Sequence, residues 1–174
     1  METAAMAAQK RASIGAKPPS TTPDESDAQP EARTRQYIAF ELGEQFYGVE
    51  ITVVREIRQW TPTAELPDQP AFGRGVLNIR GEIVPVYDLR ARLGGQMTKV
   101  SESHMVLILS IAQRSFGILV DAVSDIVSIN PATLRPVPDE SRAIEPGTLT
   151  NLAAQNGRMI SLLNCETLFT TSNK

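Results

Sequence analysis

The stretch YGVEITVVREI, residues Tyr47–Ile57, is nearly repeated as FGILVDAVSDI, residues Phe116–Ile126. With Gly48 set against Gly117, 69 positions further along the chain, residue types match along both copies. The matched pairs are Tyr47 with Phe116, Val49 with Ile118, Ile51 with Val120, Val54 with Val123, Glu56 with Asp125, and Ile57 with Ile126. Similarity in this order at a fixed spacing indicates an internal duplication.

The residues before each copy predict a β-hairpin. Apolar residues alternate with others at Ile38, Phe40 and Leu42, which is typical of a half-buried strand. The aligned positions in the second copy are Leu107, Leu109 and Ile111. A short polar turn follows each run, at residues 43–45 and 112–114. Each copy is therefore expected to begin with two antiparallel strands.

A second block is repeated in the same order. RGEIVPVYDL, residues Arg80–Leu89, aligns with NGRMISLLNC, residues Asn156–Cys165, and a glycine stands at each expected turn. Two ordered blocks predict a duplicated all-β unit of about 65 to 70 residues. A small barrel suits such a unit, because closing the sheet removes exposed edges, and the two copies are expected to pack about a pseudo-twofold axis. The alternative is that both blocks reflect generic hairpin patterning.

After the first hairpin, the apolar spacing changes from two residues to three. In the first copy the spaced residues are Ile51, Val54 and Ile57, and in the second copy they are Val120, Val123 and Ile126. This change predicts a short helical turn or a sharp bend in each connection, although an irregular strand is also compatible with it.

Composition excludes several classes of protein. The chain has 174 residues, of which 41% are apolar, with a net charge of −3, as expected of a soluble globular protein. Because 20 acidic residues outnumber 17 basic ones, no nucleic acid partner is expected. The longest apolar runs are far shorter than the roughly 20 residues of a membrane span, so no direct membrane insertion is expected. The absence of a secretory signal pattern predicts a cytoplasmic protein.

The first 36 residues differ from the rest. Residues 1–36 contain no Leu, Val, Phe, Tyr or Trp, and four prolines interrupt them. Such a segment cannot bury enough apolar surface to offset its ordering entropy, which predicts a disordered N-terminal tail. Residues 37–174 are expected to form the folded domain, with repeats beginning near residues 37 and 105.

The sequence offers little for catalysis. Histidine and cysteine each occur once, as His104 and Cys165, which leaves no zinc site and no nucleophilic triad. The glycine-rich residues 73–81 lack the phosphate-binding patterns. We therefore expect no catalytic residue, no metal and no cofactor. One enzyme hypothesis stays open, a hydrolase in which Glu56 and Asp125, at equivalent positions of the two copies, form a carboxylate dyad.

Three motifs carry a resemblance to a known family. Residues Tyr47–Ile57, NIRGEIVPVYDLR at Asn78–Arg90, and FGILVDAVSDIVSI at Phe116–Ile129 together resemble the CheW-like family, over residues 37 to about 169. The resemblance implies two intertwined five-stranded SH3-like barrels with short helical turns. It implies a non-catalytic adaptor that couples the cytoplasmic tips of methyl-accepting chemoreceptors to the regulatory domain of the histidine kinase CheA. An array controlling pili or surface sensing is the alternative setting.

The resemblance also implies which residues bind partners. The expected receptor-binding residues are Val54, Glu56, Ile57, Arg80 and Val123, and the expected coupling residues are Gly75, Gly117 and Ile126. Two alternatives stay open for these residues. Arg80 can instead form an intramolecular bridge to Glu82 or another acid, and Val54 and Val123 can belong to the core. The resemblance further places the protein at membrane-bound receptor arrays.

Overall fold

The structure, a computed structural model, describes residues 33–139 and 144–170. Within these ranges the chain forms ten β-strands in two five-stranded sheets, with two short α-helices. In spatial order, the first sheet contains β8 (Ala122–Ile129), β1 (Arg35–Leu42), β2 (Gln45–Glu50), β10 (Arg158–Leu163) and β9 (Leu149–Gln155). The second contains β3 (Val54–Gln59), β6 (Met105–Ile111), β7 (Arg114–Val120), β5 (Glu82–Asp88) and β4 (Gly73–Ile79). The all-β prediction is confirmed.

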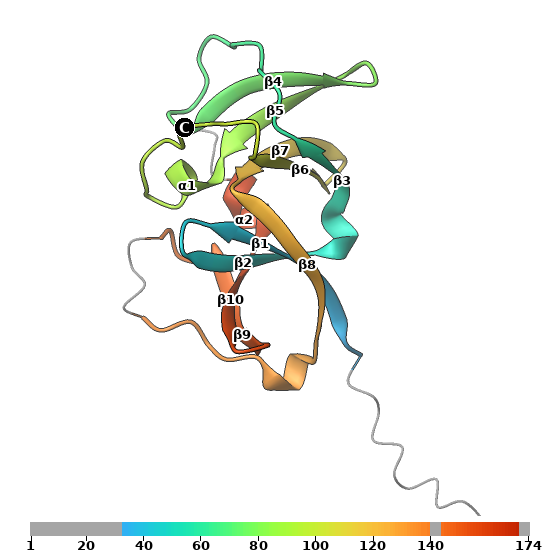
Figure 1. The fold of residues 1–174 in the computed structure, drawn as a ribbon, viewed down its shortest axis with the longest axis vertical. Coiled ribbons are helices and arrows are strands. Elements are labelled where there is room, and N and C mark those ends of the chain that lie inside the picture. Colours follow the sequence, from blue (N-terminus) through green and yellow to red (C-terminus); the bar gives the residue numbers. More distant parts are fainter. Residues whose placement is uncertain (1–32, 140–143, 171–174) are drawn as a thin grey trace, which may run out of the picture. The chain divides into compact units, whose positions relative to one another are not determined.

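The two sheets have equivalent strand orders, with the strands of one sequence copy in place of those of the other. Replacing each strand of the first sheet by its counterpart in the other copy reproduces the order of the second sheet. Strand β3 follows the first hairpin in the chain but pairs with β6 of the second copy, and β8 pairs with β1 of the first copy (Figure 1). Each barrel therefore takes strands from both copies. This exchange confirms the expected intertwined barrels.

The connections between hairpin and exchanged strand differ between the copies. In the first copy a 3-10 helix, Ile51–Val53, joins β2 to β3, as the spacing of three predicts. In the second copy only Asp121 separates β7 from β8, and the chain bends there. The alternative of a sharp bend therefore holds for the second copy.

Three apolar clusters make up the core. One lies within the first sheet, one within the second, and the largest lies between them. Along β1, Ile38 and Phe40 belong to the central cluster, whereas Tyr37 and Ala39 belong to the first barrel. Because successive strand residues point to opposite faces, each central strand serves both its own barrel and the joint between barrels.

The segment DLR, residues 88–90, is held in place by the buried carboxylate of its own Asp88. Asp88 ends β5, is fully buried, and caps the short helix α1 (Leu89–Arg92) by accepting from the amide of Ala91 at 3.2 Å. It also accepts from the amide of Thr98 at 2.7 Å and pairs with Arg74 at 2.7 Å. Burial alone would raise the pKa of Asp88, but these hydrogen bonds outweigh it and lower the pKa. The motif thus anchors the loop after β5.

The C-terminal helix α2 (Cys165–Thr170) packs against the second barrel through aromatic rings. Phe169 stacks on Phe116 with ring centroids 4.5 Å apart, and Tyr87 lies 5.6 Å from Phe169. This contact brings the end of the second copy against β5 and β7, so the helix helps to join the two copies.

The predicted tail lies almost entirely outside the described residues. Its last four residues, 33–36, are described, and of these Arg35 and Gln36 are part of β1 and pair with Ile129 and Ser128 of β8. The first strand therefore begins two residues before the expected domain boundary. Polar side chains at an edge of β1 gave no apolar signal by which the sequence could have placed this start.

Candidate docking surface

The apolar residues predicted on β3 face the joint between the barrels. Val54 pairs with Leu109 and Ile57 with Leu107, and both partners belong to the central cluster. Directly paired residues point to the same face of a sheet, so Val54 and Ile57 lie on that face too. Val54 is half-buried against the cluster, as the core alternative allowed, whereas Ile57 is 38% exposed.

The equivalent residues on β8 repeat this arrangement. Val123 pairs with Phe40 and Ile126 with Ile38, again residues of the central cluster. Val123 is half-buried, whereas Ile126 is 60% exposed. The fold therefore leaves one isoleucine from each copy exposed at the border of the central cluster. Both isoleucines are therefore accessible to a partner, as the sequence analysis expected of partner-binding residues.

Glu56 and Arg80 lie on the other face of β3. Glu56 pairs with Ile108, a residue of the second barrel's own core, so its side chain points away from the joint. Its carboxylate lies 3.5 Å from the Arg80 guanidinium and 3.7 Å from that of Arg58. The sequence analysis placed these residues in one site. The structure places them on two faces of β3, an apolar face with Val54 and Ile57 and a charged face with Glu56.

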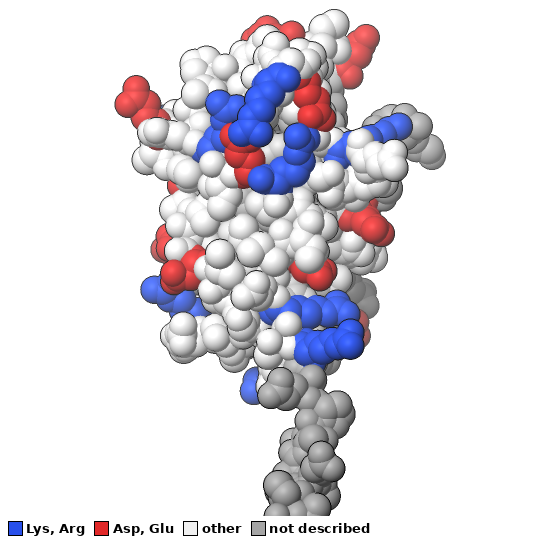
Figure 2. Space-filling model, turned by 90° about the vertical axis from the view of Figure 1, so that its right-hand side faces the viewer, with Lys and Arg blue, Asp and Glu red and all other residues white. Residues whose placement is uncertain are grey.

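Arg80 occupies the turn between β4 and β5, with a left-handed backbone (φ 54°) and a side chain that is 81% exposed. The intramolecular alternative, a bridge to Glu82 or another acid, is therefore the one that the structure contains, and the acid is Glu56. Glu82 instead pairs with Arg55 at 2.8 Å. Hydrogen bonds involving Ser115 and Arg55 lower the pKa of the exposed Glu82 carboxyl. Figure 2 shows Lys or Arg side chains interleaved with Asp or Glu side chains on the upper part of one face of the molecule.

The two predicted coupling glycines, Gly75 and Gly117, are buried. A Cβ at Gly117 would lie 3.1 Å from side-chain atoms of Val86 and Val106. Gly75 has φ +104°, and its Cβ would lie 2.2 Å from the Ala64 carbonyl oxygen. At both positions glycine permits a close approach of neighbouring strands or backbone. Their role in coupling stays a prediction, and within the fold both glycines allow neighbouring strands or backbone to lie close together.

The carboxylate dyad is not formed. Glu56 lies in the second sheet and contacts Arg58 and Arg80, whereas Asp125 lies in the first sheet. The single cysteine is no better placed for catalysis, since Cys165 is buried and burial raises the pKa of its thiol to about 12. His104 is held by Ser101, whose amide donates to Nδ1 at 3.0 Å.

No group of His, Cys, Asp and Glu suited to a metal ion occurs in residues 33–139 and 144–170. Within the same ranges, none of the helices has the length and apolar character needed to cross a membrane.

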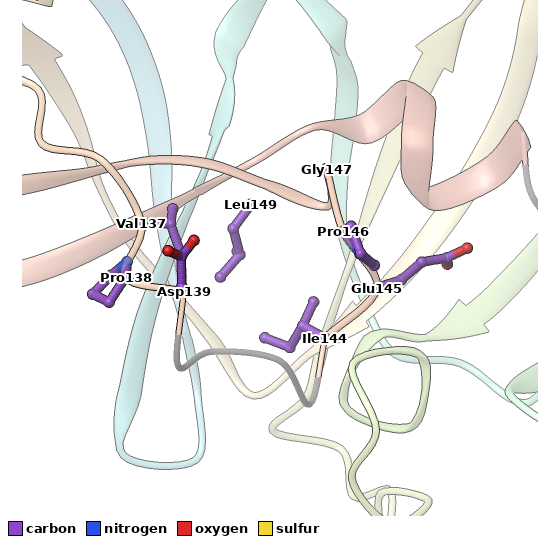
Figure 3. A pocket seen from close by; sticks show the side chains of 8 residues that line it. All are labelled: Val137, Pro138, Asp139, Ile144, Glu145, Pro146, Gly147 and Leu149. Carbon is purple, nitrogen blue, oxygen red and sulfur yellow. The ribbon is translucent and has the colours of Figure 1, made fainter.

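A hollow of about 310 Å³ lies beside the connection between β8 and β9 (Figure 3). It is lined by Val137, Pro138, Asp139, Ile144, Glu145, Pro146, Gly147 and Leu149. Its lining is mainly proline and aliphatic residues, together with the two acidic residues Asp139 and Glu145. The Glu145 carboxylate turns away from the hollow and pairs with Arg92 at 2.7 Å.

Sequence reasoning missed a second exposed apolar pair. Ile83, near the start of β5, is 60% exposed, and its counterpart Met159, near the start of β10, is 46% exposed. The alignment of the two hairpin blocks places these residues at equivalent positions. An apolar residue directly after a polar turn, in both copies, was the available signal.

The paired barrels leave apolar side chains exposed at equivalent positions of both copies, which is a feature expected of a protein-docking scaffold. The match to a family model agrees: residues 36–173 match the CheW-like domain. The chain therefore belongs to the CheW-like family of chemotaxis scaffold proteins. Membership of this family of non-catalytic adaptors confirms the prediction that the protein is not an enzyme.

Individual relatives support the assignment. The chain is 37% identical over 140 residues to the chemotaxis protein CheW of Rhizobium meliloti, covering 80% of this chain and 90% of that protein. It is 36% identical over 137 residues to the chemotaxis protein CheW of Klebsiella aerogenes, covering 79% and 82%. The crystal structure of the scaffolding protein TtCheW from Thermoanaerobacter tengcongensis is similar with a TM-score of 0.74 and 28% identity, covering 81% of this chain and 96% of that one.

Proposed function

We propose that this protein couples methyl-accepting chemoreceptors to the histidine kinase CheA within a membrane-associated chemotaxis array. The observation that carries the proposal is the exposed pair Ile57 and Ile126, which comes from equivalent positions of the two copies and borders the central cluster. A helical receptor tip docks on such a surface through apolar residues at helical spacing. Val54 and Val123, half-buried beside the isoleucines, form the floor of this receptor site.

Glu56 and Arg80 form a separate polar part of the receptor site, on the far face of β3. Because the Arg80 guanidinium is largely exposed, it can exchange its contact with Glu56 for a carboxylate of the receptor. Exposed ion pairs contribute little to the stability of the protein itself, about 0 to 1 kcal/mol, so this exchange costs little folding free energy. Charge here selects the partner and its orientation, while the isoleucines supply apolar contact.

The kinase contact is proposed from the resemblance to the family, whose kinase regulatory domain has the same fold. Two related barrels with different outer surfaces allow head-to-tail contacts, which close into rings when the rotation permits. Each contact of about 800 Å² or less per partner gives modest affinity, and the array gains strength through many such contacts. A role in an array for pili or surface sensing has weaker support, because the similarity to Protein PilI of Pseudomonas aeruginosa is 29% identity over 49% of this chain.

Co-sedimentation with receptor-containing membranes, with and without CheA, tests this proposal. Ile57→Asp and Ile126→Asp should each abolish sedimentation with receptors alone. Leu66→Asp, at an apolar residue that is 43% exposed in the β3–β4 connection, is the matched control and should sediment normally. Normal receptor binding by both isoleucine variants, with melting temperatures unchanged, would refute the proposed site.

A further inference from the structure

The pseudo-twofold relation allows the two barrels to be compared position by position at the end where the β4–β5 and β9–β10 hairpins turn. We call the end of the second sheet at the β4–β5 turn the second mouth. We call the end of the first sheet at the β9–β10 turn the first mouth. In the second mouth, charged side chains satisfy one another. Arg55 pairs with Glu82 at 2.8 Å and donates to Ser115 at 2.6 Å, while Glu56 lies between Arg58 and Arg80.

The first mouth keeps the acid but lacks its arginines. The equivalent residues there are Ser124 for Arg55, Asp125 for Glu56, Val127 for Arg58, Asn156 for Arg80 and Arg158 for Glu82. The strand registers agree with this assignment, since Asp125 pairs with Ala39 just as Glu56 pairs with Ile108. Both cations that contact Glu56 are therefore replaced by uncharged residues around Asp125.

As a result, the charges of the first mouth are not paired. Within residues 33–139 and 144–170, Asp125 makes no ion pair and its side chain makes no hydrogen bond. Arg158 does not compensate for the missing cations, because its guanidinium carbon lies 4.6 Å from the centre of the Phe46 ring, in a cation–π contact. Asp125 is thus an exposed carboxylate beside a guanidinium that is engaged elsewhere.

A hollow of about 180 Å³ opens next to this carboxylate. It is lined by Ala39, Phe46, Ser124, Asp125, Val127, Gln155, Asn156, Arg158 and Ile160. Sites for drug-sized ligands measure roughly 300 to 1,000 Å³, so this hollow suits a single long side chain instead. Its apolar residues can cover an aliphatic stem, and its lining also contains the Asp125 carboxylate and the side-chain amides of Gln155 and Asn156, whose oxygens can accept from a polar head group.

We propose that the first mouth binds an arginine side chain of a partner protein, which gives Asp125 the guanidinium that Arg80 gives Glu56. Arginine fits better than lysine, because its planar fork of donors can engage the carboxylate and a neighbouring amide oxygen together. An acidic side chain is disfavoured, since Asp125 would repel it. The second mouth shows the same fold position in its occupied form, with the arginine supplied by the chain itself.

This site is separate from the proposed receptor surface. Asp125 pairs with Ala39 of the first barrel's core, whereas Ile126 pairs with Ile38 of the central cluster, so the two neighbours point to opposite faces of β8. Binding at the first mouth can therefore fail while receptor docking stands, and the reverse also holds.

A titration of the isotopically labelled chain with N-acetyl-arginine amide, followed by NMR, tests the proposal. Saturable shifts are expected for backbone amides of residues 124–127 and 155–158. N-acetyl-citrulline amide, which keeps the shape but not the charge, should bind about fivefold more weakly or worse. Asp125→Asn should weaken the binding of the arginine probe to the same extent. Glu56→Gln removes the equivalent charge from the second mouth and should leave that binding unchanged.

A substitution that fills the site from within provides a second test. Asn156 and Arg80 occupy turns with the same left-handed backbone, φ 51° and 54°, so Asn156→Arg should fold and place its guanidinium on Asp125. It should reduce binding of the arginine probe about fivefold or more. The proposal is overturned if arginine and citrulline probes bind equally, if Asp125→Asn or Asn156→Arg binds like the unaltered chain, or if N-acetyl-glutamate amide binds more tightly than the arginine probe.

Discussion

The Asp88 carboxylate, which has no exposed surface, accepts hydrogen bonds from both the amide and the hydroxyl of Thr98, at 2.7 and 2.9 Å. This relationship joins the end of β5 to the loop ten residues further along the chain. With Arg74 and the amide of Ala91 completing the set, the carboxylate is satisfied as an anion. The second half of the VPVYDLR motif is thus explained by local structure.

Asp88→Asn should lower the free energy of unfolding by about 3 kcal/mol, because the amide leaves the Arg74 guanidinium unpaired and replaces an acceptor by a donor. Chemical denaturation measures the loss. Glu65→Gln, at an exposed position in the β3–β4 connection, is the control and should change the free energy of unfolding by less than about 0.5 kcal/mol. Equal stabilities for Asp88→Asn and the unaltered chain would contradict the assigned role.

The same carboxylate predicts a pH dependence. The folded state lowers the pKa of Asp88 below the unfolded value of about 3.9, so its contribution is fully present above that value. The contribution is lost as pH falls through the lower, folded pKa. Denaturation curves recorded between about pH 5 and pH 2 should therefore show a smaller loss of stability in Asp88→Asn than in the unaltered chain. Parallel pH profiles would show that Asp88 does not carry this linkage.

Gly75→Ala should destabilise the protein through a backbone contact. A methyl group would meet the Ala64 carbonyl, which accepts from the amide of Val76 at 2.8 Å and covers the edge of β4. Gly81→Ala is the matched control, because Gly81 also has positive φ but open space around it. We expect a loss of about 1 kcal/mol for the control and more than about 2 kcal/mol for Gly75→Ala. Similar losses for the two variants would assign the whole effect to backbone strain.

Arg80→Asp should weaken receptor binding without unfolding the protein. The side chain is largely exposed and its ion pair with Glu56 is long, so the melting temperature should change by no more than a few degrees. Co-sedimentation with receptor membranes should fall about tenfold, because the substituted carboxylate repels the acid expected on the receptor. Glu56→Lys should also weaken receptor binding without unfolding the protein, because it removes the carboxylate that holds Arg80 and places a like charge beside it. Loss of binding together with collapse of the circular dichroism signal would assign Arg80 to folding instead.

Cys165 should resist alkylation in the folded protein. Its thiol is buried, and the pKa raised to about 12 leaves almost no thiolate at pH 8. Labelling by iodoacetamide should therefore be slow in buffer and rapid in denaturant. Rapid labelling of the folded chain at pH 8 would show that α2 opens readily from the rest of the domain.

Much of the fold was accessible from the sequence because duplication doubled every signal. The hairpins, their glycine turns and the all-β class followed from alternation and from the aligned glycines at 81 and 157. The exchange of β3 and β8 between sheets did not follow from pattern alone, because periodicity reports which face of a strand is buried but not which strand lies beside it. The resemblance to the family supplied that part.

The site was predicted less completely than the fold. The resemblance to the family grouped Glu56 with Ile57, but neighbours along a strand point to opposite faces, and the bulge between Val54 and Glu56 shifts the register. Gly75 and Gly117 read as contact positions, yet their burial depends on strands remote in sequence. The unpaired Asp125 was visible only once the two barrels could be compared residue by residue.

Photo-cross-linking to receptor tips tests the central claim most directly, namely that equivalent residues of the two copies border one docking surface. A benzophenone amino acid is placed in turn at Ile57, Ile126 and the control position Leu66, and the captured receptor segment is sequenced. The account predicts that positions 57 and 126 both capture the same helical tip and that position 66 captures none. Capture of different segments by the two positions, or equal capture at position 66, would contradict it.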